Sequence, residues 1–220
     1  RGHRYLMTKG LDFTVAYGFN YVEDNYEFRT ETAFTEALTT SFTPTVGRAF
    51  SAKLEIPVGK YFRLGTGVDI LSQKRNFSVP ENSYVGVQVS SIQRHRTIQV
   101  PVYVAFDHRI RQFSVGVGVG AALQIFQHTS GAVLLEDLIV ANAETVAGRG
   151  YYNDALLFRG FAEFRTEYRP SDKIGIVARV GYQLSGPNEL GADNMAGVLK
   201  MPSVQVKFGV NYVLFCDGRR

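Results

Sequence analysis

The chain has 220 residues, of which 45% are hydrophobic, and this is enough for one domain with a sizeable core. The formal net charge is only +4, and basic residues are mixed with acidic ones along the same segments, which excludes a nucleic-acid-binding stripe. The single cysteine, Cys216, excludes an internal disulfide, and no uninterrupted apolar stretch is long enough for a transmembrane helix. We expect no metal site, no cofactor and no nucleic-acid partner.

Eight segments alternate apolar and polar residues with the period of two that is typical of β-strands. In chain order they cover residues 11–21, 50–56, 62–70, 98–106, 113–125, 158–168, 174–184 and 204–214. The connections alternate between short turns, such as GKY and RPSDK, and four longer polar or mixed stretches. This arrangement is typical of outer-membrane barrels. The predicted fold class is all-β: an eight-stranded, antiparallel, up-and-down transmembrane β-barrel with short periplasmic turns and long outer loops.

The fifth segment has glycine at three alternate positions, Gly116, Gly118 and Gly120, between valines. Glycine weakens a strand, so one face must require the absence of side chains. Solvent imposes no such crowding, whereas the lumen of an eight-stranded barrel is only wide enough for side chains to fill it. We therefore expect the glycine face to line the lumen, opposite long side chains such as Tyr103 and Arg165. The valine face should then contact lipid.

The polar faces of the strands predict a network of charges inside the barrel. Charges of both signs in a narrow interior must pair, because an isolated buried charge costs several kcal/mol. The expected result is a plug of ion pairs. The side chains assigned to this network are Arg63, Asp69, Arg159, Glu163, Arg165, Glu167, Arg179 and Lys207, with Asp12, Lys53 and Glu55 beside them.

Two residues fit a closed barrel poorly. Pro101 lies inside the fourth segment, where it cannot donate a ladder hydrogen bond, so we predict a local bulge there. Arg48 belongs to an apolar face, and we expect it near the outer rim, where a charge is tolerated.

Aromatic residues near the strand ends are expected in interfacial girdles: Phe13, Tyr21, Phe62, Phe106, Phe113, Tyr168, Tyr182 and Tyr212.

The pattern resembles the porin-like outer-membrane β-barrel domains of Bacteroidetes. The resemblance covers residues 11–215, and it implies the barrel fold without implying a shared catalytic motif. The tail CDGRR departs from the family, whose barrels usually end at the terminal aromatic residue. The segments that carry the resemblance are VGRAFSAKLEIPVGKYFRLGTGVDI, IQVPVYVAF, FSVGVGVGAAL and VQVKFGVNYVLF.

The long connections contain apolar residues that are expected outside the membrane. Leu134, Leu135, Leu138 and Ile139 occur at helical spacing in the third connection, and the first contains Phe34 and Leu38. Apolar residues exposed at such positions pack over the barrel mouth or bind a partner. These six residues are the candidate partner-binding surface.

One short motif allows an enzymatic alternative. His128 and Ser130 lie near the predicted outer end of the fifth strand, and a histidine beside a hydroxyl can activate it as a nucleophile when an acid orients the histidine. No acidic residue is fixed near the pair by the sequence, and the motif is common. We expect no enzymatic activity, and a lipid-A-modifying enzyme is the least favoured alternative.

We expect a barrel at residues 11–215 between periplasmic tails at 1–10 and 216–220. Because the chain begins RGHRYLMTKG, without a start methionine or signal peptide, we also expect that upstream sequence has been removed. The predicted function is that of an anchor or scaffold subunit in a larger outer-membrane assembly, contacting outer-membrane lipids and other outer-membrane or periplasmic proteins. The alternatives are a narrow solute channel and the C-terminal barrel of a longer signalling or anti-sigma-type protein.

Overall fold

The computed structural model describes residues 10–22, 25–28, 42–79, 89–135, 138–147, 157–184, 188–190, 197–200 and 202–214. This part of the chain forms thirteen β-strands. Within it, no helix combines the length and apolar character that crossing a membrane would require.

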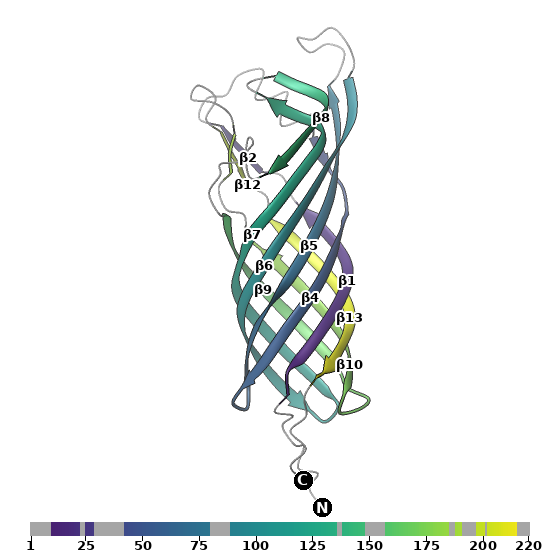
Figure 1. Cartoon of the computed structure of the whole chain (residues 1–220), viewed down its shortest axis with the longest axis vertical. Coiled ribbons are helices and arrows are strands. Elements are labelled where there is room, and N and C mark those ends of the chain that lie inside the picture. Colours follow the sequence, from purple (N-terminus) through teal and green to yellow (C-terminus); the bar gives the residue numbers. More distant parts are fainter. Residues whose placement is uncertain are drawn as a thin grey trace, which may run out of the picture.

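Eight of the strands form a closed antiparallel barrel (Figure 1). Each of these strands pairs with the barrel strand before it and the one after it, and the first and last pair with each other from Asp12↔Val213 to Val22↔Ser203. This closure confirms the predicted fold class. The barrel strands are β1 (Asp12–Val22), β4 (Gly47–Val58), β5 (Phe62–Val79), β6 (Val89–Ile110), β7 (Phe113–Leu135), β9 (Leu157–Tyr168), β10 (Ile174–Gln183) and β13 (Ser203–Val213).

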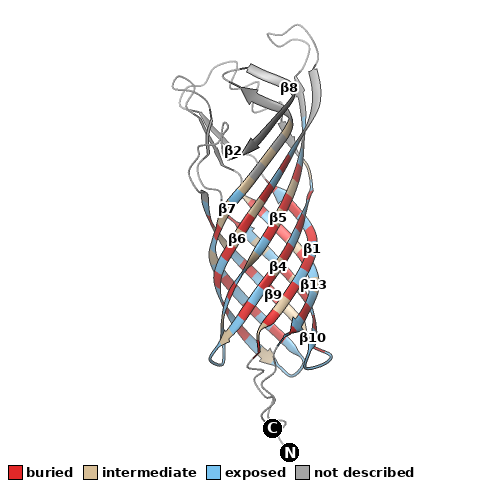
Figure 2. Ribbon diagram, viewed as in Figure 1, coloured by how far each residue is buried: buried red, intermediate tan, exposed pale blue. Residues whose placement is uncertain are grey.

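Burial alternates along every barrel strand, as Figure 2 shows. Lys53 and Glu55 on β4 are each only 1% exposed, whereas Leu54 between them is 38% exposed and Ile56 is 57% exposed. The apolar side chains therefore point outward and the charged ones inward, which is the reverse of a soluble barrel. An outward apolar band around a closed barrel is the arrangement that the bilayer requires.

The barrel wall is much taller on one side than on the other. Strands β5, β6 and β7 have 18, 22 and 23 residues, whereas the other five have 10 to 12. A strand needs about 9–11 residues to cross the bilayer, so β5–β7 continue well beyond it. The short strands β3 (Phe42–Pro44) and β8 (Leu138–Ala147) add to this extension by pairing with β5 and β7, respectively.

A second, smaller sheet lies at the same end of the barrel as this extension (Figure 1). It consists of β2 (Asn25–Phe28), β11 (Asn188–Leu190) and β12 (Gly197–Lys200), with β12 in the centre. The opposite end of the barrel carries the short turns (Figure 1).

The helical spacing inferred for the third long connection is wrong. Leu134 and Leu135 end β7, and Leu138 and Ile139 begin β8, with the register Leu134↔Ile139 and Leu135↔Leu138. Spacings of three and four residues also arise when two strand ends fold back on each other. The β-branched residues nearby favour the strand solution.

The three short turns lie at one rim, together with the start of β1 and the end of β13 (Figure 1). They join β4 to β5, β6 to β7 and β9 to β10, as predicted, although β6 extends to Ile110 and leaves a two-residue turn at Arg111 and Gln112. Gly59 has φ 77°, a left-handed conformation that glycine adopts easily, whereas Arg111 has φ 58°.

The irregularity predicted at Pro101 occurs close to it but not at it. Pro101 pairs with Ala122 on β7, and the register between β6 and β7 shifts between Ile98 and Gln99. On the other side of β6, the pairing with β5 is interrupted between Val102 and Gln99, where Pro101 lacks a donor. The proline thus interrupts one ladder while the bulge lies two residues away.

Candidate functional site: the charged lumen

The lumen contains a set of ion pairs, which we call the lumenal network. Its members are buried or half-buried side chains from seven of the eight barrel strands and from the turn after β9. They comprise six bases and six acids: Lys53, Arg63, Arg165, Arg169, Arg179 and Lys207, with Asp12, Glu55, Asp69, Asp107, Glu163 and Glu167.

The layer nearest the short turns is organised around Asp12. This carboxylate accepts hydrogen bonds from Arg63 and, at 2.7 Å, from Arg169 Nη2. Arg169 also pairs with Glu167 at 2.6 Å, and Asn211 donates to the same Glu167 oxygen at 2.8 Å. Burial alone would lower the pKa of Arg169, but the carboxylates of Glu167 and Asp12 raise it above its ordinary value, so this guanidinium stays charged at the rim.

Glu55 is the centre of the next layer. Its Oε1 atom accepts hydrogen bonds from Tyr103 Oη at 2.5 Å, Arg165 Nη1 at 2.6 Å and Arg179 Nη2 at 3.0 Å. Arg165 also makes a two-pronged contact with Asp107, in which its Nε lies 2.6 Å from Oδ1. These five residues come from β4, β6, β9 and β10, so the layer connects strands on different sides of the barrel.

Glu163 joins this layer to the one above it. It accepts from Arg179 Nη1 at 2.9 Å and from Lys53 Nζ at 2.8 Å. The Lys53 ammonium also lies over two aromatic rings, 4.9 Å from the centre of Tyr103 and 5.6 Å from that of Phe161. A cation above a ring face is favoured in such a desolvated position.

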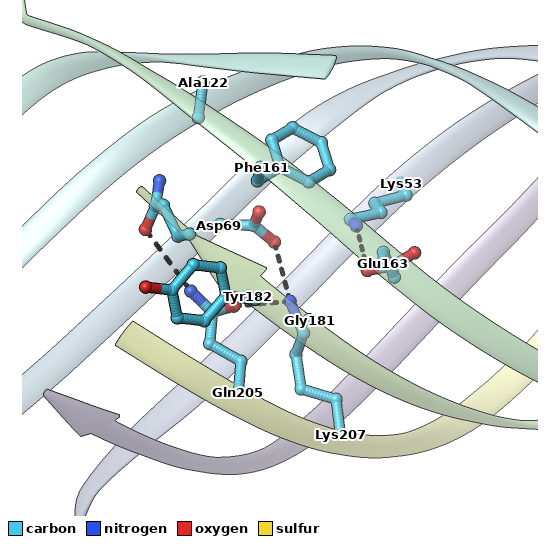
Figure 3. A pocket seen from close by; sticks show the side chains of 10 residues that line it. Lys53, Asp69, Ala122, Phe161, Glu163, Gly181, Tyr182, Gln205 and Lys207 are labelled. Atoms are coloured by element: carbon cyan, nitrogen blue, oxygen red, sulfur yellow. Dashed lines mark hydrogen bonds and ion pairs between the residues drawn. The ribbon is translucent and has the colours of Figure 1, made fainter. Parts of the chain in front are cut away.

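The last charged layer is formed by Asp69 and Lys207 (Figure 3). Asp69 accepts from Ser51 Oγ at 2.5 Å, and Lys207 Nζ lies 3.6 Å from Asp69 and 2.9 Å from Gln205 Oε1. A cavity of about 20 Å³ remains between these side chains and Glu163. That is room for about one water molecule, not for a solute path.

Above the charges, the lumen becomes neutral and polar. Gln183 donates to Gln99 at 2.8 Å, and a second cavity of about 20 Å³ lies beyond them, at the tall end. Two buried polar atoms in its lining, Asn20 Oδ1 and Gln73 Nε2, make no hydrogen bond to any described residue. His95 and Arg159 also line this cavity.

The lumenal glycines accommodate this packing unequally. A Cβ at Gly65 would lie 2.2 Å from the Tyr103 ring, one at Gly116 would lie 2.0 Å from Asp107 Oδ1, and one at Gly120 would lie 2.3 Å from the Val102 carbonyl oxygen. At Gly118 the nearest atoms would be 3.6 Å away, which is ordinary contact. Crowding by lumenal side chains therefore explains Gly65 and Gly116, and close approach of the strand backbone explains Gly120, but neither explains Gly118.

The structure brings together most of the side chains that the sequence assigned to the lumen. Arg63, Asp69, Glu163, Arg165, Glu167, Arg179 and Lys207 lie in the network, and Arg159 lies above it. Sequence reasoning missed Asp107 and Arg169 as members. Both continue an inward-facing alternation, Asp107 after Tyr103 and Ala105, and Arg169 after Glu167.

The residues proposed for partner binding and catalysis lie at the tall end. Leu134, Leu135, Leu138 and Ile139 form the tip of the β7–β8 hairpin. Phe34 and Leu38 lie outside the described residues.

His128 and Ser130 belong to β7, and their register partners on β6 are Arg96 and Arg94. On the other side of β7, the residue opposite Ser130 is Glu144 of β8.

The network closes the lumen. Each of its bases contacts at least one carboxylate, so the network carries balanced charge, and the cavity that its described residues line is water-sized. Removing one partner of a buried ion pair costs about 3–5 kcal/mol, so the arrangement is firmly held once assembled. Chemically, it can connect the strands and block passage.

Comparisons with known proteins identify the fold. The crystal structure of Neisserial surface protein A covers 92% of this chain and 97% of its own, with a TM-score of 0.50 and 10% identity. The crystal structure of the outer membrane protein OprG from Pseudomonas aeruginosa covers 93% of this chain and 97% of its own, with a TM-score of 0.53 and 10% identity. No protein-family model and no curated protein sequence matches the chain.

At such low identity these likenesses concern the fold, which is that of an eight-stranded outer-membrane β-barrel. The outward apolar band and the charged, closed interior of this chain agree with that fold independently. The chain is therefore a transmembrane β-barrel of the bacterial outer membrane, surrounded by lipid.

Proposed function

We propose that the chain is a non-enzymatic anchor or scaffold, which acts through the part that projects beyond the membrane. The observation that carries this proposal is the contrast between its closed lumen and its tall wall. The two lumenal cavities lined by described residues are each about 20 Å³, room for about one water molecule, whereas β5, β6 and β7 have about twice the residues needed to span the bilayer. A barrel built only for support in lipid has no use for strands of that length.

The orientation follows the usual arrangement of such barrels, with short turns in the periplasm and the long strands outside. Residues 11–215 are then the barrel domain, and residues 1–10 and 216–220 are periplasmic tails. Membership of the Bacteroidetes porin-like barrels remains a prediction from the sequence resemblance.

The partner in this proposal is another outer-membrane protein that contacts the β7–β8 hairpin. Leu134 and Leu135 end β7, and Leu138 and Ile139 begin β8, in the part of the wall that continues beyond the membrane-spanning segments. A cluster of apolar residues outside the bilayer is a common mark of an interaction site.

A channel function is the weaker alternative. Solutes would have to cross layers in which Glu55 and Lys53 are each 1% exposed and bound by partners from several strands. Opening such a path requires several buried ion pairs to separate together, which is costly in a low-dielectric interior.

The scaffold role is tested by extracting the tagged protein from its native cells in mild detergent and identifying what remains bound by mass spectrometry. Leu134→Ser with Leu138→Ser should release a stoichiometric partner. Ala141→Ser with Ala143→Ser, in the same hairpin, is the control and should retain it. A barrel that is recovered alone, or a partner that is retained by the leucine variant, would contradict this function.

A further inference from the structure

Four basic side chains lie on the outer face of the barrel where the tall wall leaves the apolar band. Arg48 is on β4, Lys74 on β5, and Arg94 and Arg96 on β6, and all four are exposed. None of them makes an ion pair with any residue in the described part of the chain. We call these four residues the basic rim.

The strand register brings the basic rim together. One row across β4, β5, β6 and β7 reads Arg48, Ser72, Arg96 and His128, and the next row toward the tall end reads Lys74, Arg94 and Ser130. Neighbouring strands are about 4.8 Å apart and alternate residues about 7 Å apart, so the four bases share a patch roughly 10 Å wide and 7 Å high at the backbone. Long side chains can reach one ligand from all four positions.

The row immediately below the basic rim is entirely apolar. It reads Phe50, Ile70, Ile98 and Phe126 across the same four strands. The bases therefore begin where the hydrocarbon-facing surface ends, which is the level of the lipid headgroups.

The charges of the basic rim are not paired within the described part of the chain as those of the lumen are. Lys74 and Arg94 stand directly opposite each other, and like charges in that position are destabilising. In the register, Ser130 stands opposite Glu144 of β8 and His128 opposite Val146. A bound anion would relieve the repulsion between Lys74 and Arg94.

We propose that the basic rim binds the phosphate groups of a phosphorylated glycolipid in the outer leaflet, such as lipid A. Arginine and lysine are the side chains that pair best with phosphate, and a bidentate guanidinium contact suits it in particular. The hydroxyls of Ser72 and Ser130 lie within the same two rows. The proposal uses the orientation given above but not the scaffold role.

The test uses the purified full-length chain in neutral detergent, titrated with bisphosphorylated lipid A, its monophosphorylated form and its dephosphorylated form. Bound lipid is counted by native mass spectrometry. We expect affinity to fall in that order and to weaken with rising salt, because an exposed charged contact is screened. Inorganic pyrophosphate serves as the soluble probe. It should bind far more weakly than the lipid, because it has no acyl chain to pack against the apolar row below the rim.

Lys74→Gln, Arg94→Gln and Arg96→Gln together should reduce the affinity for bisphosphorylated lipid A by roughly tenfold or more. The matched control removes three exposed bases from the turns at the opposite end, Lys60→Gln, Arg111→Gln and Lys173→Gln, and should bind as the unaltered chain does. Equal loss in both triple variants would overturn the proposal in favour of bulk charge attraction. Equal binding of the phosphorylated and dephosphorylated lipids by the unaltered chain would overturn it even if a variant failed to fold.

Discussion

The lumen and the basic rim hold the same types of basic side chain in opposite settings. Lys53 and Arg179 are 1% and 2% exposed and contact carboxylates within 3.0 Å, whereas Arg94 and Arg96 are exposed and lack an ion pair to any described residue. The strands set this difference, because one face of each strand is enclosed and the other meets lipid or water. A base in the lumen contributes to the stability of the barrel, while a base at the rim remains available to a ligand.

The largest difference is expected when one arginine is neutralised in each region. Arg165→Gln removes a guanidinium that contacts Glu55 and Asp107, so two buried carboxylates each lose one of their basic partners, and the free energy of unfolding should fall by about 3–5 kcal/mol. Arg96→Gln at the rim should leave it nearly unchanged. Urea unfolding in lipid vesicles, followed by electrophoretic mobility, measures both. Similar losses in the two variants would contradict the division into structural and available bases.

Two glycines sharpen the account of lumenal packing. Gly65→Ala places a Cβ against the Tyr103 ring and should destabilise the barrel by about 1–3 kcal/mol. Gly118→Ala finds ordinary contact distances, and the better strand propensity of alanine should make its effect close to zero or slightly stabilising. The same unfolding measurement distinguishes them. If Gly118→Ala were the more harmful change, crowding would not be the reason for glycine at position 65.

The salt concentration should affect the interactions of the two regions differently, without any mutation. The Debye length falls from about 30 Å at 0.01 M to about 3 Å at 1 M salt, so contacts at the exposed rim are screened while enclosed pairs are affected much less. The melting temperature in neutral detergent should therefore change little with salt when no lipid is added. Any rise in melting temperature that a phosphorylated lipid produces should disappear at high salt. A large salt-dependent fall in the absence of lipid would indicate that the lumenal network is open to solvent.

The smallest effect is expected at the periplasmic turn between β6 and β7. Arg111 has φ 58°, which costs a residue with a side chain but not glycine. Arg111→Gly should stabilise the barrel by at most about 1 kcal/mol, because the greater freedom of glycine in the unfolded chain offsets part of the relief. A small rise in the urea midpoint checks this. A fall would show that the arginine side chain stabilises the turn.

The barrel could be predicted from the sequence because the pattern that identifies its strands lies within each short segment of the chain. Alternation with a period of two identifies each strand and its two faces, and the glycines at 116 and 120 indicate which face is crowded. That rule also extends to Asp107 and Arg169, which occupy the next inward-facing positions.

The remaining features depend on information that no single segment contains. The leucines at 134, 135 and 138 fit a helix as well as two paired strand ends, so the local pattern could not decide between them. The basic rim depends on the register between β4, β5, β6 and β7, which is set by the stagger of the closed barrel. From the sequence, Arg48 is expected near the outer rim, but as an isolated charge. The structure explains it as one corner of a patch.

The central claim is that the lumen is closed and that the chain acts outside it. The most direct test is the conductance of the purified, full-length barrel in planar lipid bilayers. The account predicts no stepwise current from the unaltered chain, because balanced ion pairs fill the lumen from Asp12 to Lys207. Steady unitary currents from the unaltered chain that disappear with Arg165→Gln would contradict it and favour a solute channel.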